Sequence, residues 1–231
     1  MTPVSEVIQN AMVIIDDIRL DSMIQENPAL FYRKMQQYVD LALPLMSRPP
    51  ELYDCVTAEY EPCTFADYEW VSTTDSMTQQ TEVDTGKIGY DLCVVSQRSA
   101  DGTELDTYSD FVYDSETGIV TFGVQTAAGI NYEIDFCSDG SFSDLTPTMI
   151  RLFALAIAIV WDERFNHNWL NLQPKIKDSS FNTVNEANYT EKLTIRMKEN
   201  RQSFNDELRK YEQDNAYNYI LPKFGRNRDL I

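Results

Sequence analysis

Apolar residues near the N-terminus recur at steps of three and four, which is the spacing of one face of an α-helix. The pattern predicts two helices, one opening at Thr2-Pro3 and one at Asn27-Pro28, because proline is tolerated in a first helical turn. The second helix is expected to end between Pro44 and Pro50. The apolar positions are Val4, Val7, Ile8, Ala11, Met12, Ile15 and Ile18 in the first helix, and Leu30, Phe31, Met35, Tyr38, Val39 and Ala42 in the second.

A third helix is predicted over residues 147–167, which include an unbroken apolar run from Leu152 to Trp161. A membrane span needs about 20 apolar residues, so this shorter run is better interpreted as a buried core helix. Thr146 is suited to the N-cap and Pro147 to the first helical position. Because the run is apolar on every side, we expect the N-terminal helices to pack against it, which makes the helical domain discontinuous in sequence.

A fourth helix is predicted from Thr183-Val-Asn-Glu186, which fits a capping box, because no glycine or proline follows until Pro222. A helix of roughly 30 residues would be about 45 Å long, more than a compact domain of this size needs. We therefore expect part of its apolar stripe to face a neighbouring subunit. The stripe consists of Leu193, Met197, Phe204, Leu208 and Tyr211.

Between the helical regions the pattern changes to short alternating or β-branched runs with turn signals at regular spacing. The predicted strands are 52–60, 65–72, 89–97, a hairpin over 111–123 that turns at Asp114 to Gly118, and 130–137. Such a segment is typical of an antiparallel β-sandwich or barrel. The predicted fold is therefore α+β. It comprises a discontinuous bundle of about four helices over 1–50 and 145–216, a β insertion over 51–144, and an extended C-terminal tail over 217–231.

The charge of the chain supports the same division. The formal net charge is −18, and residues 51–144 carry 20 acidic residues against two bases, Lys87 and Arg98, so the remainder is neutral. Seven of the eight glycines also lie in this segment, and Pro49-Pro50 and Thr146-Pro147 mark its ends. So acidic a chain is not expected to bind a phosphate backbone. It is compatible with a passage through which DNA slides without adhering.

Catalytic, metal and cofactor motifs are not found in the sequence. The four cysteines, Cys55, Cys63, Cys93 and Cys137, form no C-x-x-C pair, and the single histidine, His167, lies far from them, so a zinc site is not expected. The N-terminus MTPVSEVIQN has no secretory signal. The cysteines are therefore expected to be reduced and to lie in or near strands.

Clustered carboxylates leave one alternative open, a metal-dependent hydrolase that uses Asp16, Asp17 or Asp162. Neighbouring helical residues point about 100° apart, so adjacent carboxylates do not converge unaided, and a solvated or ion-paired surface is favoured. The acidic residues of the loop 101–110 could bind calcium, but they lack the EF-hand spacing.

The C-terminal tail differs from the rest of the chain because aromatic and basic residues dominate it. Pro222 and Gly225 are expected to prevent regular structure there. Either the tail is a disordered end, or it becomes ordered on a partner through aromatic and arginine contacts. The candidate contact residues are Tyr217, Tyr219, Lys223, Phe224, Arg226 and Arg228.

Several phrases of the sequence resemble head–tail connector (neck adaptor) proteins of tailed bacteriophages. They are NPALFYRKMQQYVDLALPLMSRPPEL, FADYEWVS, YDSETGIVTF and LAIAIVWDERFNHNWLNLQPKIKDSSFNTVNEANYTEKL, and the resemblance covers residues 4–216. It implies a non-enzymatic virion protein, made in the bacterial cytoplasm, that forms a homo-oligomeric ring, usually of twelve copies. The ring would dock beneath the portal protein, pass genome DNA through its channel and connect to a stopper or tail completion protein.

The same resemblance implies that the C-terminal segment, here Tyr217 to Ile231, inserts into the portal. The acidic β insertion departs from the smallest adaptors, which are all-helical, so its role as outer decoration or channel lining stays open. A second hypothesis is a phage-associated binding module whose β domain recognises a glycan or a host-surface protein through Trp70, Tyr68 or Tyr90. Aromatic residues in strands are more often part of a core than of a ligand platform.

Overall fold

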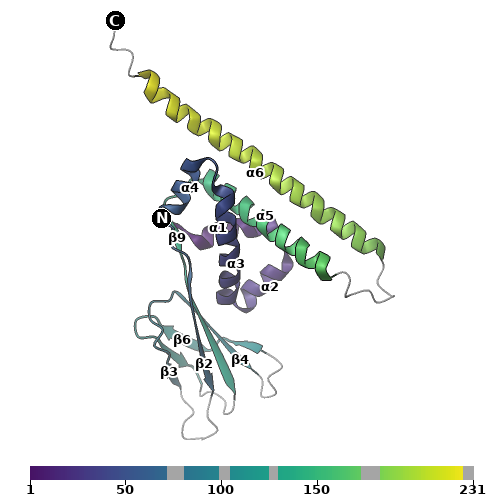
Figure 1. Ribbon diagram of the computed structural model, residues 1–231. Helices are drawn as coiled ribbons and strands as arrows, with labels where there is room; N and C mark the ends of the chain where they lie inside the picture. The colour runs from purple at the N-terminus through teal and green to yellow at the C-terminus, as the bar shows by residue number, and fades with distance from the viewer. Residues whose placement is uncertain (72–80, 99–104, 125–129, 173–182, 226–231) are drawn as a thin grey trace.

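The computed structural model describes residues 1–71, 81–98, 105–124, 130–172 and 183–225, with side chains except at 71, 105–106, 165–172, 183–190, 193 and 216–225. These ranges form a mixed α+β fold with six α-helices and antiparallel sheets (Figure 1). The helices are α1 (Val4–Ile15), α2 (Ile18–Glu26), α3 (Pro28–Ala42), α4 (Pro50–Thr57), α5 (Pro147–Leu172) and α6 (Thr183–Gly225), with a short 3-10 turn, η1 (Leu43–Met46).

The described strands form three sheets. A four-stranded antiparallel sheet has the order β2 (Thr64–Val71), β8 (Asn131–Ser138), β4 (Leu92–Arg98) and β5 (Leu105–Tyr108). A three-stranded sheet has the order β3 (Glu82–Asp84), β7 (Ile119–Phe122) and β6 (Phe111–Asp114). A third, very short sheet pairs β1 (Thr2–Pro3) with β9 (Ser141–Phe142). Neither larger sheet closes into a barrel within the described ranges.

One apolar core is built from two segments that are far apart in sequence. Helices α1 to α5, which surround this core, are here called the body. The buried side chains of the core come from Val4 to Cys63 and from Phe142 to Tyr211. Helix α5 lies at the centre: every residue from Leu152 to Ile159 is at most 5% exposed. Helix α1 and helix α3 both pack against α5, which confirms that the N-terminal helices cover the apolar run.

Two helix starts follow the predicted capping chemistry. The Thr146 hydroxyl accepts the N–H of Met149 at 3.3 Å, at the start of α5. The Asn27 side chain accepts the N–H of Leu30 at 2.9 Å, at the start of α3. In both cases the capping oxygen satisfies an N–H that has no partner inside the helix.

The first predicted helix is interrupted, contrary to the sequence expectation that it continues to Ile18. Helix α1 ends at Ile15 because Asp16 adopts a left-handed conformation, with φ 46° and ψ 56°. Asp17 then caps α2 by accepting the N–H of Arg19. Aspartate competes well for backbone hydrogen bonds outside a helix, and two adjacent aspartates therefore favour this break.

The predicted strand over 52–60 is also wrong, since Pro50–Thr57 is helix α4. Leu52 and Val56 are fully buried in the body core, one helical turn apart. Pro50 at the first helical position favours the helix, and the spacing of these two residues suits it. Cys55 consequently lies on a helix, whereas Cys63 adjoins β2, and Cys93 and Cys137 lie in β4 and β8.

The other predicted strands are confirmed as β2, β4, β6, β7 and β8. The hairpin between β6 and β7 turns where expected, because Gly118 has a positive φ of 74° and its N–H donates to the carbonyl of Asp114 at 2.8 Å. Side chains from both larger sheets share one aromatic-rich core. The two sheets together with this core are here called the β module. Its buried members are Val83, Val95, Val120, Phe122, Tyr132, Ile134 and Phe136.

The β module lies against α3 through polar contacts and a small apolar patch. Arg33 pairs with Asp67, and the Asn27 side-chain amide donates to Asp135 at 2.8 Å. Because Asp67 and Asp135 face each other across β2 and β8, α3 reaches both carboxylates at one place. Figure 1 shows the resulting shape, with the helices grouped at one end and the larger sheets at the other.

Candidate assembly surface

Helices α5 and α6 form a long antiparallel pair. Asp162, late in α5, contacts Arg196, early in the described part of α6, whereas Arg151, early in α5, contacts Glu207, further along α6. Figure 1 shows α6 running diagonally across the body, with α5 beneath it. At 1.5 Å per residue, the 43 residues of α6 extend about 65 Å, so this helix is longer than the body that it crosses.

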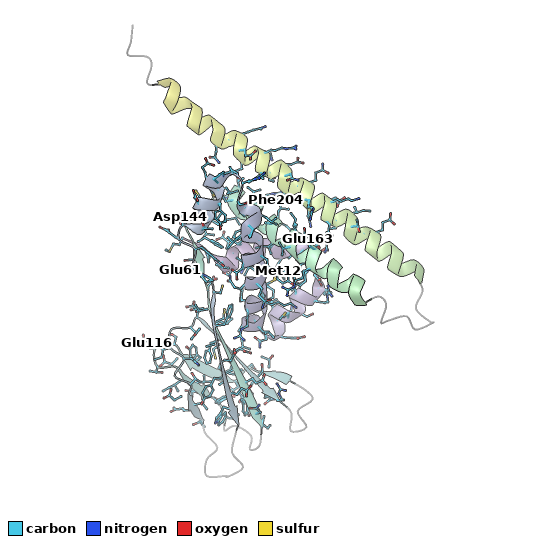
Figure 2. The ribbon with its side chains drawn as sticks, viewed as in Figure 1. Met12, Glu61, Glu116, Asp144, Glu163 and Phe204 are labelled. Atoms are coloured by element: carbon cyan, nitrogen blue, oxygen red, sulfur yellow. The ribbon has the colours of Figure 1, made fainter. Side chains whose placement is uncertain are left out.

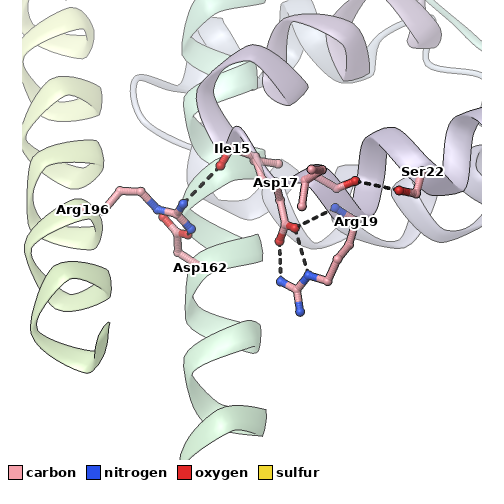
Figure 3. Close-up of polar contacts among 7 residues, drawn as sticks. Ile15, Asp17, Arg19, Ser22, Asp162 and Arg196 are labelled. Carbon is pink, nitrogen blue, oxygen red and sulfur yellow. Dashed lines mark hydrogen bonds and ion pairs between the residues drawn. The ribbon is translucent and has the colours of Figure 1, made fainter. Parts of the chain in front are cut away.

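A buried ion pair fixes α6 to the body (Figure 3). Asp162 is 1% exposed, and it accepts hydrogen bonds from the Arg196 guanidinium and, at 2.9 Å, from the Asn200 amide. Arg196 also donates to the backbone carbonyl of Ile15 at 3.1 Å. This carbonyl lies at the end of α1, where the helix leaves carbonyl oxygens without an internal partner. One arginine therefore joins α6 to both α5 and α1.

An apolar seam continues the attachment towards the C-terminus. Phe204 and Tyr211 are 8% and 9% exposed in the body core, and Leu208 packs partly buried against the same core. Figure 2 shows Phe204 between α6 and the body. Three residues of the stripe predicted to face another subunit thus pack within their own chain. Met197 is half-buried, and the side chain of Leu193 lies outside the described residues. Contact of this stripe with a neighbouring subunit stays a prediction.

Beyond Tyr211 the helix has no counterpart on α5, because α5 begins at Pro147, one turn before the Arg151 contact with Glu207. Residues 212–225, here called the overhang, extend for about 21 Å at 1.5 Å per residue. Figure 1 shows this end of α6 passing beyond α4 and the rest of the body. Glu212, Gln213 and Asp214, its first residues, are exposed.

The predicted extended tail is wrong for residues 217–225, which continue α6 as helix through Pro222. A proline removes one intrahelical hydrogen bond, but a helix that is already formed propagates at little cost per residue. The candidate partner residues Tyr217, Tyr219, Lys223 and Phe224 therefore lie on a helical backbone. Their side chains, together with Arg226 and Arg228, fall outside the described residues, so the predicted partner contacts are untested.

Two of the three carboxylates considered for metal chemistry have other partners, and the third, Asp16, is exposed. Asp162 is bound by Arg196 and Asn200, and Asp17 accepts two hydrogen bonds from the Arg19 guanidinium. The Arg19 hydrogen bond holds the pKa of Asp17 below its ordinary value. Within the described ranges, no group of three or more His, Cys, Asp and Glu side chains is arranged to hold a metal ion. The loop carboxylates at 101 and 104 lie outside those ranges.

The aromatic residues of the second hypothesis are part of the β-module core. Trp70 packs against Tyr132 and Phe122, with ring centroids 5.4 and 5.9 Å apart, and Tyr90 packs against Phe136 at 5.7 Å. Tyr68 is half-buried against the same cluster. Their rings therefore stabilise the module, which is the more frequent role of strand aromatics.

Comparison with protein-family models, curated proteins and solved structures finds no match to this chain. Among the helices of the described residues, no segment combines the length and the apolar character that a bilayer span requires.

Proposed function

We propose that this protein is a structural subunit of the neck of a tailed bacteriophage, a head–tail connector that is not an enzyme. The observation that carries the proposal is the overhang, a helical segment that leaves the body after Tyr211 and continues into aromatic and basic sequence. A helix that projects from its own core leaves its apolar residues for another protein, because a helix in a groove is a common recognition mode. The partner in this proposal is the portal protein.

In this proposal, copies of the chain assemble into a ring, of twelve subunits by the family resemblance, and connect to a stopper or tail completion protein below. Genome DNA passes through the ring without specific binding, which suits a chain of net charge −18. The finer architecture belongs to the same proposal: a discontinuous helical bundle with an inserted β-sandwich. Each subunit would act in the virion, between capsid and tail.

The rigid attachment of α6 supports a docking role. Arg196 and Phe204 hold the middle of the helix on the body. These contacts set the direction in which α6 leaves the body, and the overhang is already helical before any partner binds. A helix that is ordered in advance loses less conformational entropy on docking than a disordered tail does, and it binds more tightly for the same contacts.

The test is a truncation that ends the chain at residue 216, measured for binding to the portal ring of the same phage. We expect a folded protein, because the described core contacts end at Tyr211, and loss of portal binding. Combined Tyr217→Ser, Tyr219→Ser and Phe224→Ser substitutions should have the same effect. Tyr53→Ser, which alters a 38% exposed aromatic residue on α4, is the matched control and should bind normally.

Unimpaired docking of the truncated chain would contradict the assignment of the overhang to the portal. Ring formation is a separate readout. Mass photometry with the portal present should show ring-sized particles, whereas a monomer under all conditions would contradict the connector proposal as a whole.

A further inference from the structure

A cavity of about 300 Å³ opens on the body between α2, α3 and the late part of α5. Its polar lining consists of Arg19, Lys34, Gln37 and Arg164, and the rings of Tyr38 and Trp161 form part of its wall. Three of these side chains are cationic, and the described lining includes no carboxylate. This is unusual for a chain with a net charge of −18, and it sets up a local positive potential.

Two of the cations have no carboxylate to neutralise them. Within the described part of the chain, neither Lys34 nor Arg164 has an acidic oxygen within 4.0 Å, whereas Arg19 pairs with Asp17. Lys34 and Arg164 are both exposed at the cavity rim. The two charges are therefore available to a ligand that enters from solvent.

Aromatic rings hold these cations in place. The Lys34 ammonium lies 5.8 Å from the centroid of Trp161, and the Arg164 guanidinium lies 5.4 Å from that of Tyr38. The two rings pack against each other with centroids 4.9 Å apart. Cation–π contacts at these distances are attractive, and they restrict two otherwise flexible side chains to the same side of the cavity.

Trp161, one of the lining residues, carries a buried donor that has no partner in the described residues. The Trp161 indole nitrogen is buried and makes no hydrogen bond there. An indole N–H can only donate, and buried donors are normally paired. The accessible polar groups of the lining are the Lys34 ammonium, the Arg164 guanidinium and the Gln37 amide, which combine positive charge with hydrogen-bond donors and so complement an oxyanion.

We propose that this cavity binds an oxyanion, either a phosphate or a carboxylate. Lys34 and Arg164 provide the positive charges that contact it. The planar guanidinium of arginine matches the two oxygens of either group, and lysine adds a point charge. The volume lies at the lower end of small-molecule sites, so the site holds the anionic group with few further atoms. Tyr38 and Trp161 are 7% and 6% exposed, which leaves no ring face on which a nucleobase could stack.

The test is titration of the full chain by calorimetry with inorganic phosphate and, in a second arm, with acetate, each against chloride at matched ionic strength. We expect saturable binding of at least one oxyanion, and the arm that saturates identifies the group. The double variant Lys34→Gln, Arg164→Gln should bind at least tenfold more weakly, because charge-assisted hydrogen bonds are lost. Arg209→Gln, which alters an exposed arginine on α6, is the matched control and should bind as the unaltered chain does.

A second readout follows Trp161 itself, whose ring lies beside the Lys34 ammonium. The indole N–H resonance of Trp161, assigned through Trp161→Phe, should shift saturably with the same dissociation constant. Absence of saturable binding in both arms would overturn the proposal. Equal weakening in Arg209→Gln, or an indole resonance that does not move at saturation, would overturn it as well, because binding would then lie elsewhere on the surface.

Discussion

The body and the β module bury apolar residues in different ways, and the difference explains where the charge of the protein lies. In β8 the buried residues Tyr132, Ile134 and Phe136 alternate with Glu133 and Asp135. Successive side chains of a strand point to opposite faces, so one strand contributes to a core and carries acidic residues at the same time. Helix α5 is buried on all sides from Leu152 to Ile159, and its charged residues lie before and after that run.

The comparison shows that the acidic excess of the middle segment does not conflict with folding. The module core is a cluster of aromatic rings, in which Phe122 lies within 6 Å of Trp70, Tyr108 and Tyr132. The body core around α5 mixes aliphatic residues with separate ring pairs, Phe142 with Phe153 and Tyr38 with Trp161. Alanines at 154, 156 and 158 allow close helix packing there. We expect perturbations of the two cores to be large, and perturbations of the charges between them to be small.

The largest expected effect is cavity creation in either core. Phe153→Ala in the body and Phe136→Ala in the β module each remove a fully buried ring. Each should lower the free energy of unfolding by roughly 3–5 kcal/mol, measured by urea denaturation. Far-UV circular dichroism follows the body. Trp70 fluorescence follows the module when both variants are made in a Trp161→Phe, Trp169→Phe background, which removes the other two tryptophans. A loss below about 1 kcal/mol for either variant would show that the corresponding core is not packed as described.

The next effect concerns the buried ion pair that holds α6. Arg196→Met leaves the buried Asp162 carboxylate with only Asn200, so the free energy of unfolding should fall by about 3 kcal/mol. The matched variant is Arg201→Met, whose partner Glu163 has a side chain 43% exposed. It should cost less than about 1 kcal/mol. Equal losses in the two variants would contradict the special role of Arg196.

A smaller, pH-dependent effect is expected where the two regions meet. The hydrogen-bonded Arg33 guanidinium holds the pKa of Asp67 below its ordinary value of 3.8. A carboxylate whose pKa is lowered on folding stabilises the protein above its unfolded pKa, and the contribution is lost as pH falls through the folded pKa. Arg33→Gln should therefore reduce stability by less than about 1 kcal/mol near neutral pH, and by progressively less below pH 3.8.

Asp135, which pairs with Asp67 across the two strands, shows a pKa shift in the other direction, because burial raises its pKa. Its ionisation costs stability as pH rises from 3.8 through its folded pKa. Asp135→Asn should remove that pH-dependent loss, and Arg33→Gln should not. Denaturation curves of both variants at several pH values separate the two carboxylates. A loss in Arg33→Gln that is independent of pH would rule out the Asp67 pair as its cause.

The smallest perturbation is chemical labelling of thiols. Burial raises the pKa of Cys63, Cys93 and Cys137 to about 12, whereas Cys55 is exposed on α4. Because the thiolate is the reactive form, iodoacetamide at mildly alkaline pH should label Cys55 rapidly and the other three only after unfolding. Mass spectrometry of the native protein checks this. Rapid labelling of Cys93 would show that β4 opens without global unfolding.

The sequence predicts the body and the module where one local signal dominates. The apolar run of α5, the caps at Asn27 and Thr146, and the glycine turn at 118 each specify their structure through nearby residues. Prediction fails where short-range signals compete. The segment 52–60 has strand-like residues. It nevertheless forms α4, because Leu52 and Val56, one helical turn apart, are both buried in the body core.

The candidate surfaces show the same limit. The stripe on α6 is evident from its spacing, but the sequence does not reveal that Phe204 and Tyr211 pack on their own α5. The cavity lined by Lys34, Tyr38 and Arg164 depends on α2, α3 and α5, which meet only in the folded chain. No local pattern in the sequence marks this cavity, so it could not be predicted before the fold was known.

The central claim, that the overhang is a preformed docking helix, is tested most directly by hydrogen–deuterium exchange of the full chain with and without the portal ring. We expect the amides of residues 212–225 to exchange faster than those of 196–211 in the free protein and to become protected when the portal is bound. Protection confined to the body or the β module, with the overhang unchanged on binding, would contradict it.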